Sequence, residues 1–493
     1  MKLLAMPLPR SLEQLPRVTA RQALVLAVAM GLALRLYHFF RLPSVWHDEA
    51  VVLLSAIHLN FYQLLGPLIH HEAAPPLFMM IERVMFLTFG DTLYVFRALP
   101  LAASCLSLCL LASIAWQLLP RPAAVLATAL FAVSDRLLYH AIEAKPYALD
   151  VLFATALIWL ELKSRDWSLR RRCLTALAFF PVALWLSFPA CFMLGGWFLA
   201  QVPMLLRSRS RGDWIAAITL AVAVAGSFLV LLTGPIAAQR DASMESCWHD
   251  GFPDWSRVWT VPIWATVSTF NILGYCVHPQ GWLLAGFVIV GSIWMQRTHG
   301  PLLLTLMLAP WALNFVAALA GKYPYSGQRV LVYMTPAVVL LTAAGVPPVV
   351  AWCRRHAPAA LLIVLFTLAL PFVNTARRTV EQWNRPNANE ANALVRERWQ
   401  PGDRIAFNNW EAEYALWTLR DAWIVPGETI PPGRQRLWYV ALAPDPAVRE
   451  TVIRAIPPVW QAVERREFKG VTVLLLTTDS ADATASHIPT FSD

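Results

Sequence analysis

Charged side chains are scarce in this sequence, because Asp, Glu, Lys and Arg make up only 14% of its 493 residues while 57% are hydrophobic. A soluble protein carries roughly a quarter charged residues, so the composition excludes an ordinary soluble enzyme. The apolar residues form runs close to the length that crosses about 30 Å of hydrocarbon. The sequence therefore predicts a polytopic α-helical membrane protein.

No nucleotide-binding motif is visible in the sequence. Residues 386–477 contain no Gly-rich phosphate loop and no catalytic-triad spacing. The net charge of +9 does not indicate a nucleic-acid partner. The positive residues fall in short loops between apolar runs, which is typical of loops on the inner side of a membrane.

We expect about eleven membrane-spanning helices, followed by a small soluble domain. The predicted spans are 22–40, 96–119, 123–139, 146–163, 173–187, 190–206, 214–234, 281–296, 301–320, 330–351 and 359–374. The first span is too long for a signal-peptide core, so we expect it to remain as a helix. The basic loops all lie on one side if the N-terminus is cytoplasmic, and eleven spans then place the C-terminal domain on the other side.

The chain divides into three parts by composition. Residues 1–374 are the membrane domain, with long outer loops at 41–95 and 235–280. Residues 375–480 alternate between helix and strand patterns, as in a small α/β domain, and 481–493 form a disordered tail. Cys247 and Cys276 share the second outer loop, where a disulfide and two unpaired thiols are both compatible with the sequence.

The segment Trp46-His47-Asp48-Glu49-Ala50 follows the first span and brings two carboxylates to the outer side. An acidic pair at a helix start is often only a cap. The predicted topology, however, brings other ionisable residues to the same side, which favours a site. These residues are His71, Glu72, Glu143, Lys145, Lys322 and Arg329.

Three of these acids and one imidazole could hold a divalent ion. Asp48, Glu72 and Glu143 would suit magnesium or manganese, and His71 would add affinity for zinc or manganese. The alternative is that His71 orients a carboxylate by a hydrogen bond. Arg35 is a further candidate, because a charge inside a membrane span is costly; its alternative is to extend towards the surface.

The order of these motifs resembles bacterial members of glycosyltransferase family 39 in the GT-C superfamily. Relatives in that superfamily include protein O-mannosyltransferases and the lipid A aminoarabinose transferase. The matching pieces, in chain order, are Trp46 to Ala50, His71-Glu72 with Pro75-Pro76-Leu77, Phe89-Gly90 leading to Arg97 and Pro100, Glu143 to Tyr147, and the Tyr-rich turn that ends at Arg329. The resemblance covers residues 20–150 and 320–350.

The resemblance implies a hexosyl- or pentosyltransferase of the bacterial inner membrane that uses a polyprenyl-phosphate sugar. Transfer would invert the sugar and take place at the periplasmic face, on a lipid, glycan or protein acceptor. Asp48 would be the base, supported by Glu49, Glu72 and Glu143. The donor phosphate would meet Lys145, Arg329, Arg97 and Lys322. Supporting positions are His47, His71, Tyr147 and Arg35.

Physical chemistry agrees with this role for the charged residues. Lipid phosphate is a good leaving group, so cations can stabilise its developing charge while a carboxylate takes the acceptor proton. The alternatives are a flippase of lipid-linked saccharide, a polymerase or ligase of surface polysaccharide, and a non-catalytic partner. A flippase would require charges near the bilayer midplane and paired repeats.

Overall fold

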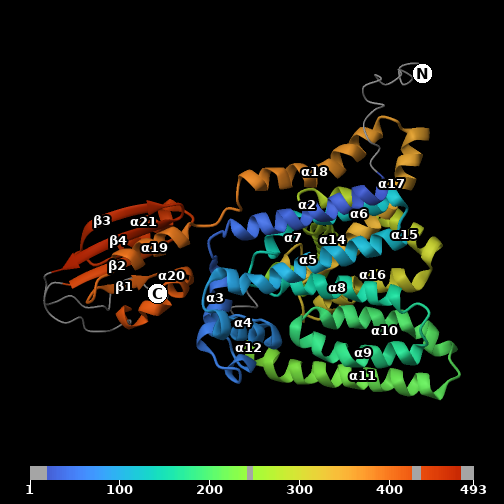
Figure 1. The fold of residues 1–493 in the computed structure, drawn as a ribbon, viewed down its shortest axis with the longest axis horizontal. Helices are drawn as coiled ribbons and strands as arrows, with labels where there is room; N and C mark the ends of the chain where they lie inside the picture. The colour runs from blue at the N-terminus through green and yellow to red at the C-terminus, as the bar shows by residue number, and fades with distance from the viewer. Residues whose placement is uncertain (1–18, 241–247, 425–434, 479–493) are drawn as a thin grey trace.

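The computed structural model describes residues 19–240, 248–424 and 435–478. Most of these residues form long helices that run side by side, and a small sheet domain sits at one end of them (Figure 1). The predicted tail at 481–493 lies outside the described residues. Cys247, which was considered as a disulfide partner of Cys276, lies outside them as well.

The helical part is built from long apolar segments. Its α-helices are α2 (Ala20–Phe40), α3 (His47–His58), α4 (Pro76–Phe89), α5 (Leu93–Leu118), α6 (Arg121–Ala132), α7 (Asp135–His140), α8 (Tyr147–Lys163), α9 (Leu169–Leu186), α10 (Ala190–Arg207), α11 (Arg211–Leu231), α12 (Ala237–Gln239), α14 (Val261–Cys276), α15 (Ala285–His299), α16 (Pro301–Leu319), α17 (Thr335–His356) and α18 (Ala360–Val380). Short 3-10 turns include η2 (Ile69–His71), η5 (Trp255–Thr260), η6 (Gly281–Leu284) and η7 (Arg329–Met334).

Within the described residues, seven helices are long and apolar enough to span a membrane. The number is eight if the bent pair Trp255–Cys276 and Gly281–His299 counts as one span. The protein is therefore an integral membrane protein. The expected count of eleven is not confirmed, because α6 has only 12 residues and α8 only 17.

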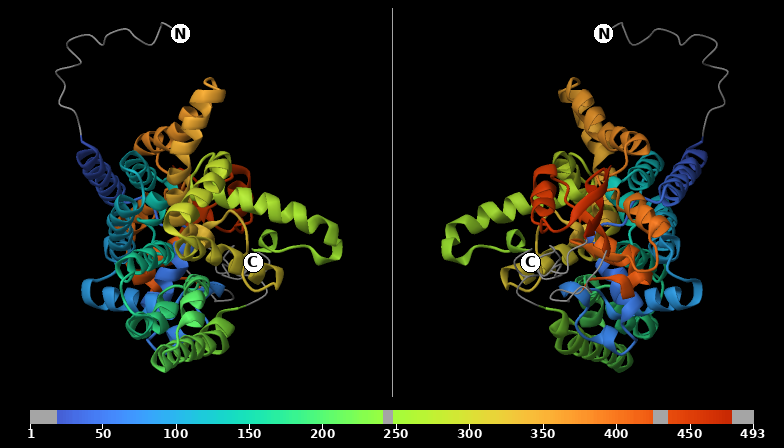
Figure 2. Two further views of the ribbon diagram at one scale, coloured as in Figure 1. Left: turned by 90° about the vertical axis from the view of Figure 1, so that its right-hand side faces the viewer. Right: turned by 90° about the vertical axis from the view of Figure 1, so that its left-hand side faces the viewer.

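The segment predicted as an outer loop at 235–280 is more ordered than a loop. It contains α14, which meets the following helical segment at an angle of 101°. Its sequence carries several Trp and interrupting polar residues, which favour an interfacial position over a continuous span. The two opposite side views show the separate directions of the helices in this part of the chain (Figure 2).

Arg35 connects three helices inside the bundle. Its Nε atom donates to Ser104 Oγ on α5 at 2.8 Å, and one terminal nitrogen donates to the Ala132 carbonyl at 3.3 Å. The side chain is fully buried. Arg35 therefore does not extend to the surface, and it lies in the packing of α2, α5 and α6.

The C-terminal domain is a four-stranded sheet with the order β1-β2-β4-β3. The strands are β1 (Arg404–Phe407), β2 (Gln435–Leu442), β3 (Gln461–Phe468) and β4 (Val471–Thr478). β1 pairs with β2 in parallel, and the other pairs are antiparallel. The helices are α19 (Ala388–Arg398), α20 (Trp410–Ala415), η8 (Trp417–Ala422) and α21 (Pro446–Arg454). Buried apolar residues lie on both faces of the sheet.

The C-terminal domain docks on the segment between α2 and α5. The hydroxyl of Tyr414 donates to the Asp91 carbonyl, and Trp417 Nε1 donates to Asp91 Oδ2, both at 2.9 Å. Arg385 donates to the Ser44 carbonyl at 2.9 Å. These contacts hold α20 against α3, as Figure 1 shows at the domain junction.

Candidate active site

A cavity of about 970 Å³ lies where the membrane domain meets the sheet domain. Its wall includes most of the predicted site residues and several that the sequence did not single out. The lining residues used below are His47, Asp48, His70, His71, Glu72, Lys145, Tyr147, Asp150, Trp248, Lys322, Arg329 and Trp410. They come from α3, η2, the start of α8, the turns before η5 and η7, and α20.

Asp48 lies in the first turn of α3 and forms an ion pair with Arg329, the first residue of η7. Trp46 and Trp248 flank the guanidinium, with their ring centroids 5.2 and 5.6 Å from its central carbon. Rings at this distance attract a cation and restrict its position. The predicted base and a predicted phosphate-binding residue therefore lie in direct contact.

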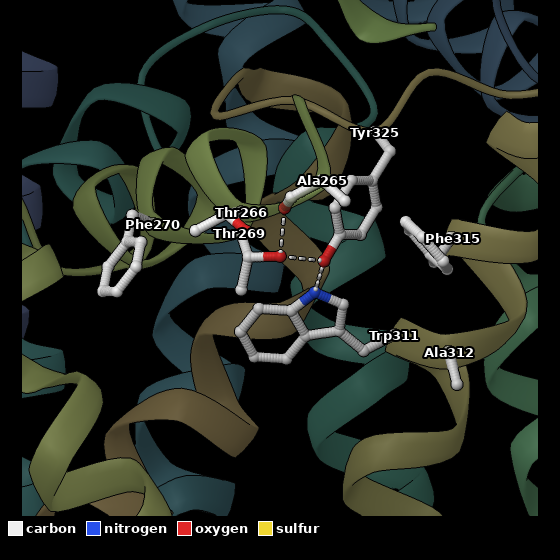
Figure 3. A pocket seen from close by; sticks show the side chains of 8 residues that line it. All are labelled: Ala265, Thr266, Thr269, Phe270, Trp311, Ala312, Phe315 and Tyr325. Carbon is white, nitrogen blue, oxygen red and sulfur yellow. Dashed lines mark hydrogen bonds between the residues drawn. The ribbon is translucent and has the colours of Figure 1, made fainter. Parts of the chain in front are cut away.

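Hydrogen bonds made by Tyr325 hold the turn that carries Arg329 in place. Trp311 Nε1 donates to the Tyr325 hydroxyl at 2.6 Å, and the Thr269 hydroxyl lies 2.8 Å from the same oxygen (Figure 3). The Tyr325 backbone also donates to the Gly251 carbonyl at 2.8 Å. A smaller pocket of about 430 Å³ lies beside this anchor, on the α14 and α16 side.

Lys145 and Glu72 form a second ion pair in the cavity wall. Lys145 is buried, and Glu72 is partly exposed. His70 and His71, just before Glu72, both have positive φ values of 52° and 58°. This left-handed turn is uncommon for residues other than glycine, and it lets both imidazoles line the cavity.

Glu143 is buried behind the cavity wall. Its carboxylate accepts from Trp46 Nε1 at 2.8 Å and from His140 Nδ1 at 2.7 Å. Burial alone would raise the pKa of Glu143, but the His140 hydrogen bond and the charges of Arg385 and Arg329 hold it below its ordinary value. Glu143 therefore orients Trp46, which in turn flanks Arg329.

Glu49 and Arg97 form a buried pair away from the cavity. Two Arg97 nitrogens donate to the two Glu49 oxygens, each at 2.7 Å, and both side chains are fully buried. The Ala144 backbone donates to Glu49 at 2.9 Å. Neither residue lines the cavity. The structure thus places the predicted catalytic Glu49 and phosphate-binding Arg97 in a network that fixes the start of α3 against α5.

The remaining predicted residues line the cavity. His47, Tyr147 and the exposed Lys322 all form part of its wall. Burial lowers the pKa of His47, which favours its neutral form. The lysines and arginines of the wall are Lys145, Arg240, Lys322 and Arg329.

The four residues predicted as metal ligands do not fit one divalent ion. In the part of the chain that the structure describes, no three side chains of His, Cys, Asp or Glu lie close enough to share one. Asp48 and Glu72 face cations, and Glu143 is enclosed by Trp46 and His140. Carboxylates paired with Arg and Lys fit an anion-binding wall better than a cation site.

Several residues of the cavity were not predicted as site residues. Trp410 and Trp248 come from segments that no motif marked, and Asp150 lies one turn into α8. Arg385, from the start of the C-terminal domain, does not line the cavity, but it packs 4.6 Å from the Tyr139 ring and lies 3.4 Å from Glu49. The alternating helix and strand patterns of residues 375–480 predicted an ordered domain, but they did not indicate that it reaches the site.

Comparisons with known proteins give a structural match only. No protein-family model and no curated protein matches the sequence. The crystal structure of ArnT from Cupriavidus metallidurans in the apo state is similar, with a TM-score of 0.52 at 13% identity, and the match covers 93% of this chain and 98% of that one. The structure of the same ArnT bound to undecaprenyl phosphate gives a TM-score of 0.52 at 11% identity, with the same coverage.

The fold is the GT-C fold of ArnT. The match extends over both the helices and the C-terminal domain, because it covers nearly all of each chain. It confirms the fold that the motif order predicted. At this identity the similarity concerns the fold, so the roles of individual residues have to be argued from this chain's own geometry.

Proposed function

We propose that this protein is a glycosyltransferase that moves a sugar from a polyprenyl-phosphate donor to an acceptor hydroxyl at the outer face of the membrane, with inversion. The observation that carries the proposal is the contact between Asp48 and Arg329 in the wall of a large cavity. The presence of undecaprenyl phosphate in a structure of similar fold supports the choice of lipid.

The cations of the wall account for binding of the donor phosphate. Arg329 offers two parallel N–H groups to phosphate oxygens, and Lys145 and Lys322 add positive charge from two other segments. A bound phosphate competes with Asp48 for Arg329. Donor binding would therefore release the Asp48 carboxylate at the moment when a base is needed.

The transfer step then needs only groups that are present in the cavity. The acceptor oxygen forms a bond to the anomeric carbon, and the bond from that carbon to the phosphate oxygen breaks. The electron pair leaves with the lipid phosphate, where Arg329 and the lysines stabilise it, and the acceptor proton passes to Asp48. Attack on the face opposite the leaving group inverts the sugar.

The test uses the full-length protein in lipid nanodiscs, with Asp48→Asn, Arg329→Gln and wild type compared. Donor and acceptor come from an envelope extract of a deletion strain, and products are identified by mass spectrometry. Asp48→Asn should lower transfer by about 100-fold or more, the size expected for a lost general base. It should retain binding of undecaprenyl phosphate, whereas Arg329→Gln should weaken that binding by about tenfold or more.

The matched control is Asp166→Asn, because Asp166 is an exposed carboxylate in the turn after α8. It should match the wild type in both assays. Transfer by folded Asp48→Asn at the wild-type rate would overturn the catalytic assignment. Unchanged lipid-phosphate binding by Arg329→Gln would overturn the phosphate site.

A further inference from the structure

Among the described residues of the C-terminal domain, one residue, Trp410, lines the cavity. Trp410 begins α20, and its position is set by the preceding Asn409, whose side chain caps the helix by accepting from the Ala412 backbone at 2.7 Å. The indole is stacked with His47 at 3.8 Å and with His70 at 4.8 Å between ring centroids. The three rings together form an aromatic wall (His47, His70 and Trp410).

The aromatic wall is held in place by a hydrogen bond as well as by stacking. Glu413, one turn along α20 from Trp410, lies 2.7 Å from His70 Nε2. His47 directly precedes Asp48 at the start of α3. Trp410 therefore contacts His47, which is the sequence neighbour of the proposed base Asp48. A movement of α20 would move the Trp410 ring against His47, beside Asp48.

The donor and acceptor must occupy different sides of this cavity. A polyprenyl chain remains in the hydrocarbon, so the donor approaches from the membrane side and its phosphate meets Lys145 and Arg329. The aromatic wall lies on the side of the sheet domain, because Trp410 belongs to that domain. The acceptor hydroxyl has to approach Asp48, which is next to this wall.

We propose that Trp410 positions the acceptor, and that the aromatic wall forms a binding surface for a carbohydrate acceptor. This inference rests on the proposed function. The negative faces of aromatic rings attract the weakly positive C–H groups of a sugar ring. The nearby carboxylate of Asp48 can accept a hydrogen bond from one of its hydroxyls. The soluble domain is therefore part of the active site and selects the acceptor.

The test compares Trp410→Ala and Trp410→Phe with Trp417→Ala. Trp417 is the matched control, because it is a tryptophan of the same domain junction that contacts Asp91 and does not line the cavity. Transfer is measured against increasing amounts of acceptor-containing envelope extract from the deletion strain, with the lipid-linked donor added to saturation. Undecaprenyl phosphate binding and thermal unfolding are measured on the same samples.

Trp410→Ala should raise the half-saturating amount of extract by about tenfold or more, since it removes acceptor binding that is equal in the ground state and the transition state. Its maximal rate and its binding of undecaprenyl phosphate should stay close to those of the wild type. Trp410→Phe should recover most of the loss, and Trp417→Ala should leave half-saturation unchanged. Digestion of the glycans in the extract should remove acceptor activity.

Three results would overturn the inference. Trp410→Ala could saturate as the wild type does, Trp417→Ala could show the same shift, or acceptor activity could survive glycan digestion and be lost on proteolysis. None of these affects the Asp48 assignment, which depends on the maximal rate of Asp48→Asn. Failure of the inference and failure of the proposed function are therefore distinguishable.

Discussion

Opposite charges across the cavity come from segments that are far apart in the chain. Asp48 meets Arg329, and Glu72 meets Lys145, so these two carboxylates of the wall are each paired with a cation from a later turn. These ion pairs keep the charged side chains ordered when no anion is bound, because neither partner is left unpaired. A phosphate that replaces the carboxylates keeps the cations paired and frees Asp48 to accept a proton.

Glu411 carries the clearest pH dependence at the residue scale. It is buried where α20 meets α3, and burial raises its pKa from 4.5 to about 7, with the Asp48 charge acting in the same direction. In the unfolded chain this carboxyl ionises near 4.5, so folding becomes less favourable as pH rises from about 4.5 to 7. Above about pH 7 Glu411 is ionised in the folded protein as well, and its burial then lowers the free energy of unfolding by the full amount.

Glu411→Gln removes this penalty and keeps an acceptor oxygen. We expect its thermal unfolding temperature to exceed that of the wild type at pH 8 and to approach it at pH 4.5, measured by intrinsic fluorescence in detergent. Glu397→Gln, at an exposed position of α19, should show no such pH dependence. An equal gain for Glu411→Gln at both pH values would contradict this explanation.

Some site residues could be predicted from the sequence and others could not, for a physical reason. Asp48, Glu72, Lys145 and Arg329 follow or precede apolar runs, so charge-based topology placed them on one side. Topology carries no information about which of them touch. Trp410 had no signal at all, because its role depends on the docking of a separate domain.

At the scale of elements, apolar residues predict strands at 437–442 and 471–476, and the structure contains them as β2 and β4. The sequence does not predict β3, whose residues Gln-Ala-Val-Glu-Arg-Arg-Glu-Phe are half charged and mostly exposed. β3 lies at the edge of the sheet and pairs only with β4 among the described strands. Charged residues are common on edge strands because they oppose further strand pairing, so a hydrophobic pattern is missing there.

Packing of α15 against α17 depends on two glycines. A Cβ atom added at Gly291 would lie 1.8 Å from the Leu341 carbonyl oxygen, and one at Gly345 would lie 2.1 Å from the Phe287 carbonyl oxygen. Backbones can approach this closely only where side chains are absent, as at small-residue contacts between membrane helices. The contact places α17, and with it the preceding η7 and Arg329, relative to the bundle.

Gly291→Ala should therefore lower the thermal unfolding temperature, at a cost of about 1–3 kcal/mol or more from overpacking. Gly286→Ala is the matched control, since it lies on the same helix and an added Cβ would meet nothing within 4 Å. Both variants are compared by thermal unfolding and by size-exclusion profile in detergent. Equal stability of the two variants would contradict the close approach of α15 and α17.

At the scale of the whole molecule, two ends of the helical bundle have opposite character. The sheet domain and α3 lie at one end, and the turns after α8 and α10 lie at the other (Figure 1). Residues of α3 and of the sheet domain line the cavity, so the cavity is at the first of these ends. These far turns carry arginines, including Arg170 and Arg209. Since basic turns remain in the cytoplasm, the cavity should open to the periplasm, where lipid-linked sugars and envelope acceptors meet.

This orientation is tested with single cysteines in a chain whose seven natural cysteines are replaced by serine. Val463 of β3 is 63% exposed and lies on the sheet domain, whereas Arg170 is exposed in the first turn of α9. In spheroplasts, a membrane-impermeant maleimide should label Val463→Cys at once and Arg170→Cys only after detergent is added. The reverse pattern would place the cavity in the cytoplasm. Transfer at the outer face would then be excluded, because Asp48 and Trp410 would lie on the wrong side of the membrane.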